Sequence, residues 1–224
     1  MHIGINQKIL KLVAIAAMTA DHIGIRFGAR LPASFCVTLR LIGRLAFPLY
    51  AFLAIEGCQH THSKSSYLFR LFILTMISEV PFDRVNACGW DHQNVIFTIL
   101  FGVIACMAFD KWFLHFRKVQ YLFLVALCLI LPQIFKTDYG FAGACVIFGG
   151  YLARKFKVLD NGPLLLAICS ALTVFSSTTE LFSMPVSLLA SLYNGRKGHE
   201  SVVEKWLYRV WYPLHLTILA IIPI

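Results

Sequence analysis

Charged side chains are scarce in this sequence of 224 residues. Asp, Glu, Lys and Arg together make up 14% of it, whereas a soluble domain usually carries about 25%. A single soluble domain of this length would expose more surface than so few charges can cover. Because 58% of the residues are hydrophobic, the composition also excludes a disordered chain. It indicates an integral membrane protein that crosses the bilayer several times.

The sequence also lacks clustered cysteines. Its seven cysteines are scattered singly, mostly inside apolar runs, and no CxxC spacing occurs. Structural metal sites and disulfide frameworks usually depend on such clusters. We therefore expect neither a disulfide framework nor a metal cofactor.

No polar stretch is long enough to form a domain outside the membrane, so we expect one transmembrane domain over residues 1–224. A spanning helix needs about 20 mostly apolar residues, or fewer where neighbouring helices cover it. Apolar runs occur near residues 9–28, 35–56, 67–82, 94–113, 119–135, 139–153, 162–176, 181–193 and 206–223. The first has no cleavage signature and is expected to be retained. The predicted fold is an all-α, polytopic transmembrane helix bundle of about nine spans, with eight to ten allowed.

Basic residues outnumber acidic ones, 20 against 11, but they lie in short clusters between the apolar runs. Cytoplasmic loops of membrane proteins carry such clusters, so we expect no nucleic acid as a partner. With a cytoplasmic N-terminus and nine spans, fourteen basic residues fall inside: Lys8, Lys11, Lys64, Arg70, Lys111, Arg117, Lys118, Arg154, Lys155, Lys157, Arg196, Lys197, Lys205 and Arg209. Four fall outside: Arg26, Arg30, Arg84 and Lys136. This asymmetry predicts a cytoplasmic N-terminus and an external C-terminus.

Ionisable residues at membrane depth are costly, and each is a candidate for function. Asp21 and His22 lie about ten residues past Lys11, or ~15 Å along a helix. His215 lies ten residues past Lys205 and reaches a similar depth. Neighbouring residues on a helix point ~100° apart, so Asp21 and His22 should each have a partner on another helix.

Two arginines fall within the second apolar run. Arg40 and Arg44 are four residues apart, which places both guanidinium groups on one helix face. Because they cannot face lipid, they require a carboxylate, a wet cavity or an anionic ligand. Asp21 and Glu56 are the available countercharges, and Glu79 is a further one. Pro48 frees a backbone carbonyl and predicts a kink in the same run.

Further polar groups gather at the predicted outer ends of later runs. Ser78 and Glu79 close the third run, and Asn94 opens the fourth. Tyr139 opens the sixth run, where an interface aromatic or a helix cap would also account for it. Tyr212 lies on one helical stripe with His215.

Several of these segments together resemble the TraX family. The runs are KLVAIAAMTADHIG, LRLIGRLAFPLYAFLAIEGCQHT, YLFRLFILTMISEVPFD, NVIFT and YPLHL, in that order. The resemblance is dense over residues 11–102 and in the last helix, and the middle adds mainly DYG at 138–140. It implies an integral membrane protein of the bacterial cytoplasmic membrane. The founding member is similar to an acetyltransferase that modifies the amino terminus of conjugative pilin.

The resemblance implies acyl transfer from acetyl-CoA, with no metal, to a peptide amine or to a glycan amine or hydroxyl. Such a reaction needs a base and groups that stabilise an oxyanion. The expected base or transient acyl carrier is His22, with His215 as the alternative and Asp21 as the orienting group. The residues expected to bind substrate or coenzyme are Arg40, Arg44, Glu56, Ser78, Glu79, Asn94, Tyr139 and Tyr212. The nucleotide is expected at the inner face, on the basic loop around Lys64 and Arg70.

The sequence leaves two other functions open. A transporter would also use charges at the membrane midplane and a helix broken at Pro48, although the sequence has no two-halves repeat. A structural or assembly protein without chemistry would use the same polar residues as ion pairs. The identity of the acceptor is likewise open.

Overall fold

The computed structural model describes residues 4–114, 118–158, 161–174 and 178–223. Helices account for most of this part of the chain, and the described residues contain no strand beyond two isolated bridges. The α-helices are α1 (Gln7–Phe27), α2 (Ala33–Gly43), α3 (Ala46–His60), α4 (Lys64–Asn86), α5 (Val95–Leu114), α6 (Val119–Ile134), α7 (Gly140–Lys155), α8 (Gly162–Thr173), α9 (Val186–Leu192) and α10 (Val202–Ile221). Two short 3-10 helices are η1 (Gly89–Asp91) and η2 (Thr178–Ser183). The predicted all-α class is confirmed.

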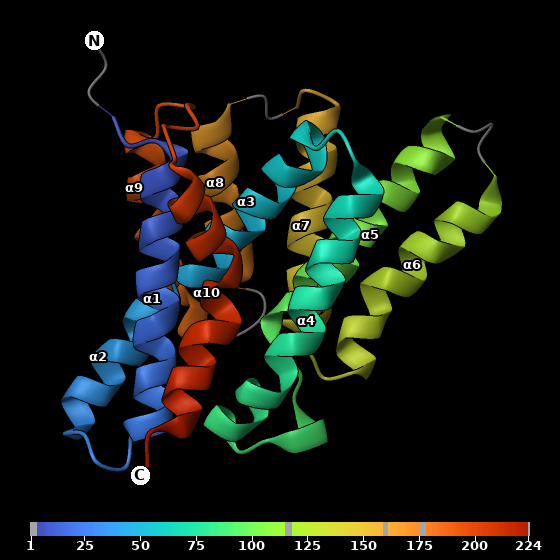
Figure 1. Ribbon diagram of the computed structural model, residues 1–224. Helices are drawn as coiled ribbons and strands as arrows, with labels where there is room; N and C mark the ends of the chain where they lie inside the picture. The colour runs from blue at the N-terminus through green and yellow to red at the C-terminus, as the bar shows by residue number, and fades with distance from the viewer. Residues whose placement is uncertain (1–3, 115–117, 159–160, 175–177, 224) are drawn as a thin grey trace.

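The nine predicted apolar runs each coincide with a helical segment. α2 and α3 share the second run, and η2 and α9 share the eighth. The long segments run up and down through one bundle, with both α1 and α10 beginning at the end where the chain starts (Figure 1). Arg117 lies outside the described residues.

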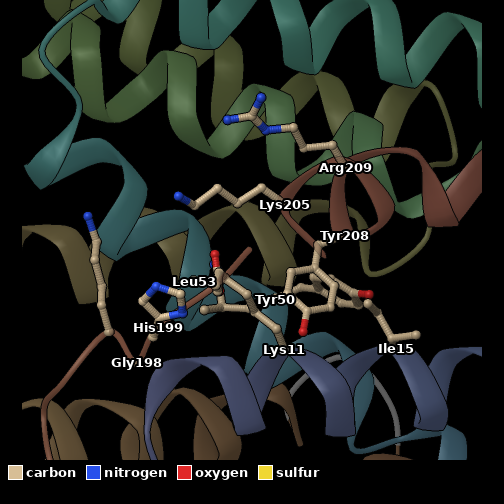
Figure 2. A pocket seen from close by; sticks show the side chains of 11 residues that line it. Lys11, Ile15, Tyr50, Leu53, Gly198, His199, Lys205, Tyr208 and Arg209 are labelled. Carbon is tan, nitrogen blue, oxygen red and sulfur yellow. The ribbon is translucent and has the colours of Figure 1, made fainter. Parts of the chain in front are cut away.

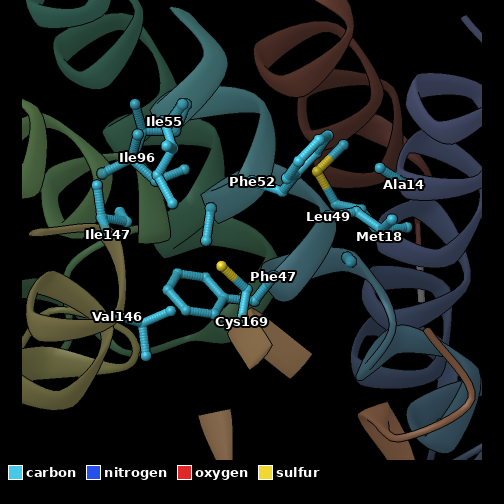
Figure 3. Packing of buried hydrophobic residues seen from close by; sticks show 14 of the residues in the cluster. Ala14, Met18, Phe47, Leu49, Phe52, Ile55, Ile96, Val146, Ile147 and Cys169 are labelled. Atoms are coloured by element: carbon cyan, nitrogen blue, oxygen red, sulfur yellow. The ribbon is translucent and has the colours of Figure 1, made fainter. Parts of the chain in front are cut away.

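α3 is the central helix of the bundle. Ten of its fifteen residues are buried, among them Phe47, Leu49 and Phe52. They pack between Met18 of α1 on one side and Ile147 of α7 on the other (Figure 3). α3 begins just after Arg44. Its packing against its neighbours therefore fixes the positions of the polar groups near its start.

The predicted kink occurs as a break between α2 and α3. α2 ends at Gly43 and α3 begins at Ala46, so Arg44 and Leu45 lie between them. Pro48 has no backbone N–H to donate to the carbonyl of Arg44, four residues earlier. This missing hydrogen bond accounts for the position of the break, and Arg44, at the break, pairs with Asp21 of α1.

Much of the outer surface is apolar. Exposed hydrophobic side chains lie on α4, α6 and α10, including Phe72, Ile77, Phe123, Leu214 and Ile218. A soluble monomer rarely exposes so much contiguous apolar surface, whereas lipid covers it readily. Two segments, Ala33–His60 and Val95–Leu114, are long and apolar enough to cross a membrane. Together these features indicate a membrane protein, while nine spans and a cytoplasmic N-terminus stay predictions.

Candidate functional site

The first and last long helices lie side by side and run parallel. Near their starts, Lys11 pairs with Glu200 at 2.7 Å, just before α10. Farther along, Trp211 Nε1 donates to Thr19 Oγ1 at 3.0 Å. At the far end, Arg26 Nε donates to the carbonyl of Leu219 at 3.2 Å. These contacts hold α1 and α10 in one register over most of their length.

The register brings His22 and His215 together. His22 Nδ1 lies 3.0 Å from His215 Nε2, and both residues are buried, with exposed fractions of 6% and 3%. Tyr212 lies edge-on to the His22 ring, with ring centroids 6.0 Å apart. The sequence predicted a similar depth for the two histidines, and the structure places them in direct contact.

The backbone determines how the protons are arranged in this pair. His215 Nδ1 lies 2.8 Å from the carbonyl oxygen of Trp211, which can only accept a hydrogen bond. Nδ1 of His215 therefore carries the proton, and its Nε2 accepts. His22 Nδ1 must then be the donor to His215, which leaves the lone pair on His22 Nε2. The His22 ring also interacts with the backbone of Met18, one turn earlier, and no donor among the described residues is found at His22 Nε2.

A network of ion pairs lies beside the histidines. Asp21 accepts from Arg40 NH1 at 2.8 Å and from Arg44 NH2 at 2.9 Å, so of the three countercharges that the sequence offered, Asp21 pairs with both arginines. Arg44 NH1 donates to Glu180 at 2.8 Å, and Tyr139 Oη donates to the other oxygen of Glu180 at 3.3 Å. Arg44 Nε donates to the carbonyl of Arg40. With all three guanidinium nitrogens engaged, Arg44 stabilises the helix break and has little capacity left to hold a ligand.

The sequence did not identify Glu180, and it proposed Glu56 and Glu79 as countercharges in its place. Glu56 instead pairs with Arg154 NH1 at 2.7 Å. It follows Arg44 by twelve residues, or ~18 Å along the helix, so it belongs to the other end of the bundle. A lone carboxylate in the apolar stretch ELFSMPVSLL was the available signal for Glu180.

Glu79 and Asn94 form a separate contact between α4 and the start of α5. Glu79 Oε2 accepts hydrogen bonds from the backbone and the side-chain amide of Asn94, while its Oε1 is buried without a hydrogen-bond partner. Asn94 Oδ1 accepts from the backbone N–H of Ile96 at 2.9 Å and so caps α5. Ser78 is fully buried and donates to the carbonyl of Leu74 in its own helix. In the described structure, no hydrogen bond joins Ser78 to the histidine pair.

A loop histidine lies near this contact, outside the spanning segments. His92 Nε2 lies 3.5 Å from Asp138 Oδ1, and its ring stacks on Phe82. Phe82 in turn lies edge-on to His22, with centroids 6.3 Å apart. The hydrogen bond and the charge of Asp138 raise the pKa of His92 above its usual value. His92 and Phe82 therefore form a line of ring contacts that runs from the loop to His22.

The opposite end of the seam between α1 and α10 contains a cavity of about 560 Å³. Its lining includes Lys11, Tyr50 and Lys205, with the segment 197–200 on one side (Figure 2). The sequence placed the nucleotide on the loop around Lys64 and Arg70 instead. Lys64 is paired with Asp110 at 2.5 Å, and neither Lys64 nor Arg70 lines this cavity.

Comparison with known proteins agrees with the motifs. A family model described as TraX protein matches residues 6–223. This chain belongs to the TraX family. Similar proteins include Probable fimbrial assembly protein FimC, serogroup H1, of Dichelobacter nodosus, which is 26% identical over 94% of this chain and 93% of its own. Protein TraX of Escherichia coli is 25% identical over 97% of this chain and 87% of its own. No solved structure gives a significant match.

Proposed function

We propose that this TraX-family protein is a membrane acyltransferase in which His22 Nε2 acts as the general base. The hydrogen bond between His22 and His215 carries the proposal. It is anchored by a backbone carbonyl at its far end, and it leaves one unoccupied basic nitrogen in a buried site. A buried, oriented imidazole of this kind suits the removal of a proton from an acceptor. His215 is a positioning residue, since it acts through His22.

The step balances as follows. An acceptor nitrogen or oxygen attacks the carbonyl carbon of an acetyl thioester, and its proton passes to His22 Nε2. The carbon–sulfur bond breaks, and the thiolate leaves with the proton from His22, which restores the neutral pair. Acetyl-CoA is the expected donor, as the family resemblance implies.

The acceptor is expected from the outer side or from within the membrane. Glu79, with its unpartnered Oε1, and Asp138 lie at the end of the bundle where the α4–α5 loop and the start of α7 meet. The relative from Dichelobacter nodosus is named for fimbrial assembly, which supports a pilus subunit as one acceptor. A surface glycan fits the same position. We place the chain in the bacterial cytoplasmic membrane as a multi-pass protein, with its N-terminus in the cytoplasm.

The test is transfer of radiolabelled acetyl groups from acetyl-CoA to membrane material, with His22→Asn as the variant. The Asn amide can still donate to His215 Nε2, but it has no basic nitrogen at the position of Nε2. We expect transfer to fall at least ~100-fold, the lower range for loss of general acid–base catalysis. Yield and melting temperature in detergent should stay close to wild type.

His215→Gln is the matched control, because its amide oxygen can accept the proton of His22 Nδ1. We expect it to retain more activity than His22→Asn. If His22→Asn keeps more than about a tenth of the wild-type rate, a loss below ~1.4 kcal/mol in barrier, His22 is structural and the proposal is wrong. A wild-type protein that moves a solute across vesicles without transferring acetyl groups would favour the transporter.

A further inference from the structure

The cavity at the start of α1 and α10 has an excess of positive charge. Four of its lining residues are cationic: Lys11, Lys197, Lys205 and Arg209. Its one carboxylate, Glu200, is already paired with Lys11 at 2.7 Å. Within the described structure, Lys205 and Arg209 form no ion pair. Lys205 and Arg209 are four residues apart on α10 and extend in the same direction over the cavity (Figure 2).

The shape of the cavity suits a ligand with two different ends. Lys197, Lys205 and Arg209 are exposed, while the apolar and aromatic lining residues Ile15, Tyr50 and Leu53 are half-buried. The 197–200 segment closes one side, and its His199 faces the same space (Figure 2). A purely anionic ligand would need no such apolar lining, whereas an anionic group on an organic chain would use both parts.

The cavity and the histidine pair share the same two helices. His22 follows Lys11 by eleven residues on α1, and His215 follows Lys205 by ten on α10, so each lies ~15 Å deeper along its helix. Ile15, on the cavity wall, lies seven residues or ~10 Å before His22. A chain that binds by its phosphates at the cavity would have to pass the contact of Trp211 with Thr19 to bring its far end to the histidines.

We infer that this basic cavity binds the phosphate groups of the acyl donor, with Lys205 and Arg209 as the principal phosphate ligands. The inference rests on the proposed function, which needs a thioester at His22. It moves the docking position away from the loop around Lys64 and Arg70, because Lys64 is already paired with Asp110 and neither Lys64 nor Arg70 lines the cavity. Phosphate groups also occur on anionic lipids, so the experiment separates a soluble phosphorylated carrier from a lipid headgroup.

The experiment measures binding of coenzyme A, without an acyl group, to the full-length protein in a non-ionic detergent by calorimetry. The double variant Lys205→Gln, Arg209→Gln should bind at least tenfold more weakly than wild type. The matched control is Lys111→Gln, Lys118→Gln, which removes two exposed positive charges, one near the end of α5 and one directly before α6. It should bind coenzyme A as wild type does. Equal affinity of the wild type and the cavity variant would overturn the inference.

A second arm uses nanodiscs with and without phosphatidylglycerol. Coenzyme A binding that is unchanged by this lipid supports a soluble donor. If wild type binds no coenzyme A but enriches phosphatidylglycerol through Lys205 and Arg209, the ligand is a lipid and the inference is wrong. His22→Asn should bind coenzyme A normally. Should that variant still transfer acetyl groups while the cavity variant loses binding, the proposed base fails and the cavity assignment stands.

Discussion

Arg44 and Arg40 differ in how much of the fold depends on each. Arg44 contacts Asp21, Glu180 and the carbonyl of Arg40, and 16% of its side chain is exposed. Arg44→Gln would leave Glu180 without its ion-pair partner in a buried position. Breaking a buried ion pair costs roughly 3–5 kcal/mol. We expect a large fall in melting temperature in detergent and in the amount of protein in the membrane.

Arg40→Gln is the matched comparison. Arg40 makes a single ion pair with Asp21, and 41% of its side chain is exposed. Without Arg40, Asp21 keeps its second partner Arg44 and no carboxylate is left unpaired, so this variant should lose less stability than Arg44→Gln. If the melting temperatures of the two variants fall equally, the burial of Arg44 does not determine its contribution to stability. Arg44 would then be available to bind a ligand.

The residue contacts were only partly predictable. Asp21 and Arg44 could be paired because the sequence offers few carboxylates at that depth. Glu180 was missed because it lies in η2, between two weak apolar runs, where no helical period fixes its direction. His22 and His215 could be assigned to one depth by counting residues. Their contact depends on α1 and α10 being neighbours, which tertiary packing decides.

The crossing of α1 and α2 depends on two glycines. A Cβ atom added at Gly43 would overlap the side chain of Asp21, and one added at Gly24 would lie 3.2 Å from Cβ of Leu39. Gly43→Ala should therefore push α2 away from α1 and separate Asp21 from both arginines. Overpacking of this kind costs about 1–3 kcal/mol, and we expect lower melting temperature together with lower acetyl transfer.

Gly149→Ala is the control for this change. Gly149 lies within α7, and a Cβ there would meet nothing within 4 Å. Since Ala favours helix by up to ~1 kcal/mol over Gly, that variant should be neutral or slightly more stable. A stable, active Gly43→Ala variant would show that α2 can shift without loss, and that the Asp21 network does not depend on this close crossing.

Helical elements were predicted more accurately than their ends. The long runs correspond to α1, α4 and α5 because a continuous apolar stretch has few other structures in a membrane. The kink at Pro48 was predicted, and the structure places the break four residues earlier, where the lost hydrogen bond would have been. The region 178–192 forms two short helices, η2 and a seven-residue α9, where the sequence predicted one apolar run.

For the whole molecule, the parallel contact of α1 and α10 limits the topology. Both helices begin at the same end of the bundle, as the pairs Lys8–Glu204 and Trp211–Thr19 require. The chain must therefore cross an even number of times before α10 begins, which makes the total odd if α1 and α10 both span. Nine spans fit, and so do seven spans with a re-entrant hairpin formed by α8, η2 and α9.

We expect nine spans, with the N-terminus inside and the C-terminus outside. Leu164 on α8 and Leu188 on α9 are exposed, as lipid-facing residues would be. Alkaline phosphatase fusions after residues 63, 118, 156 and 198 should be inactive, because the basic residues nearby keep these loops in the cytoplasm. A fusion after residue 91 should be active, and so should one after Thr178 if α8 crosses fully. Alkaline phosphatase activity at two of the four inner positions would reject this orientation. Activity after residue 91 but not after Thr178 would reduce the number of spans to seven.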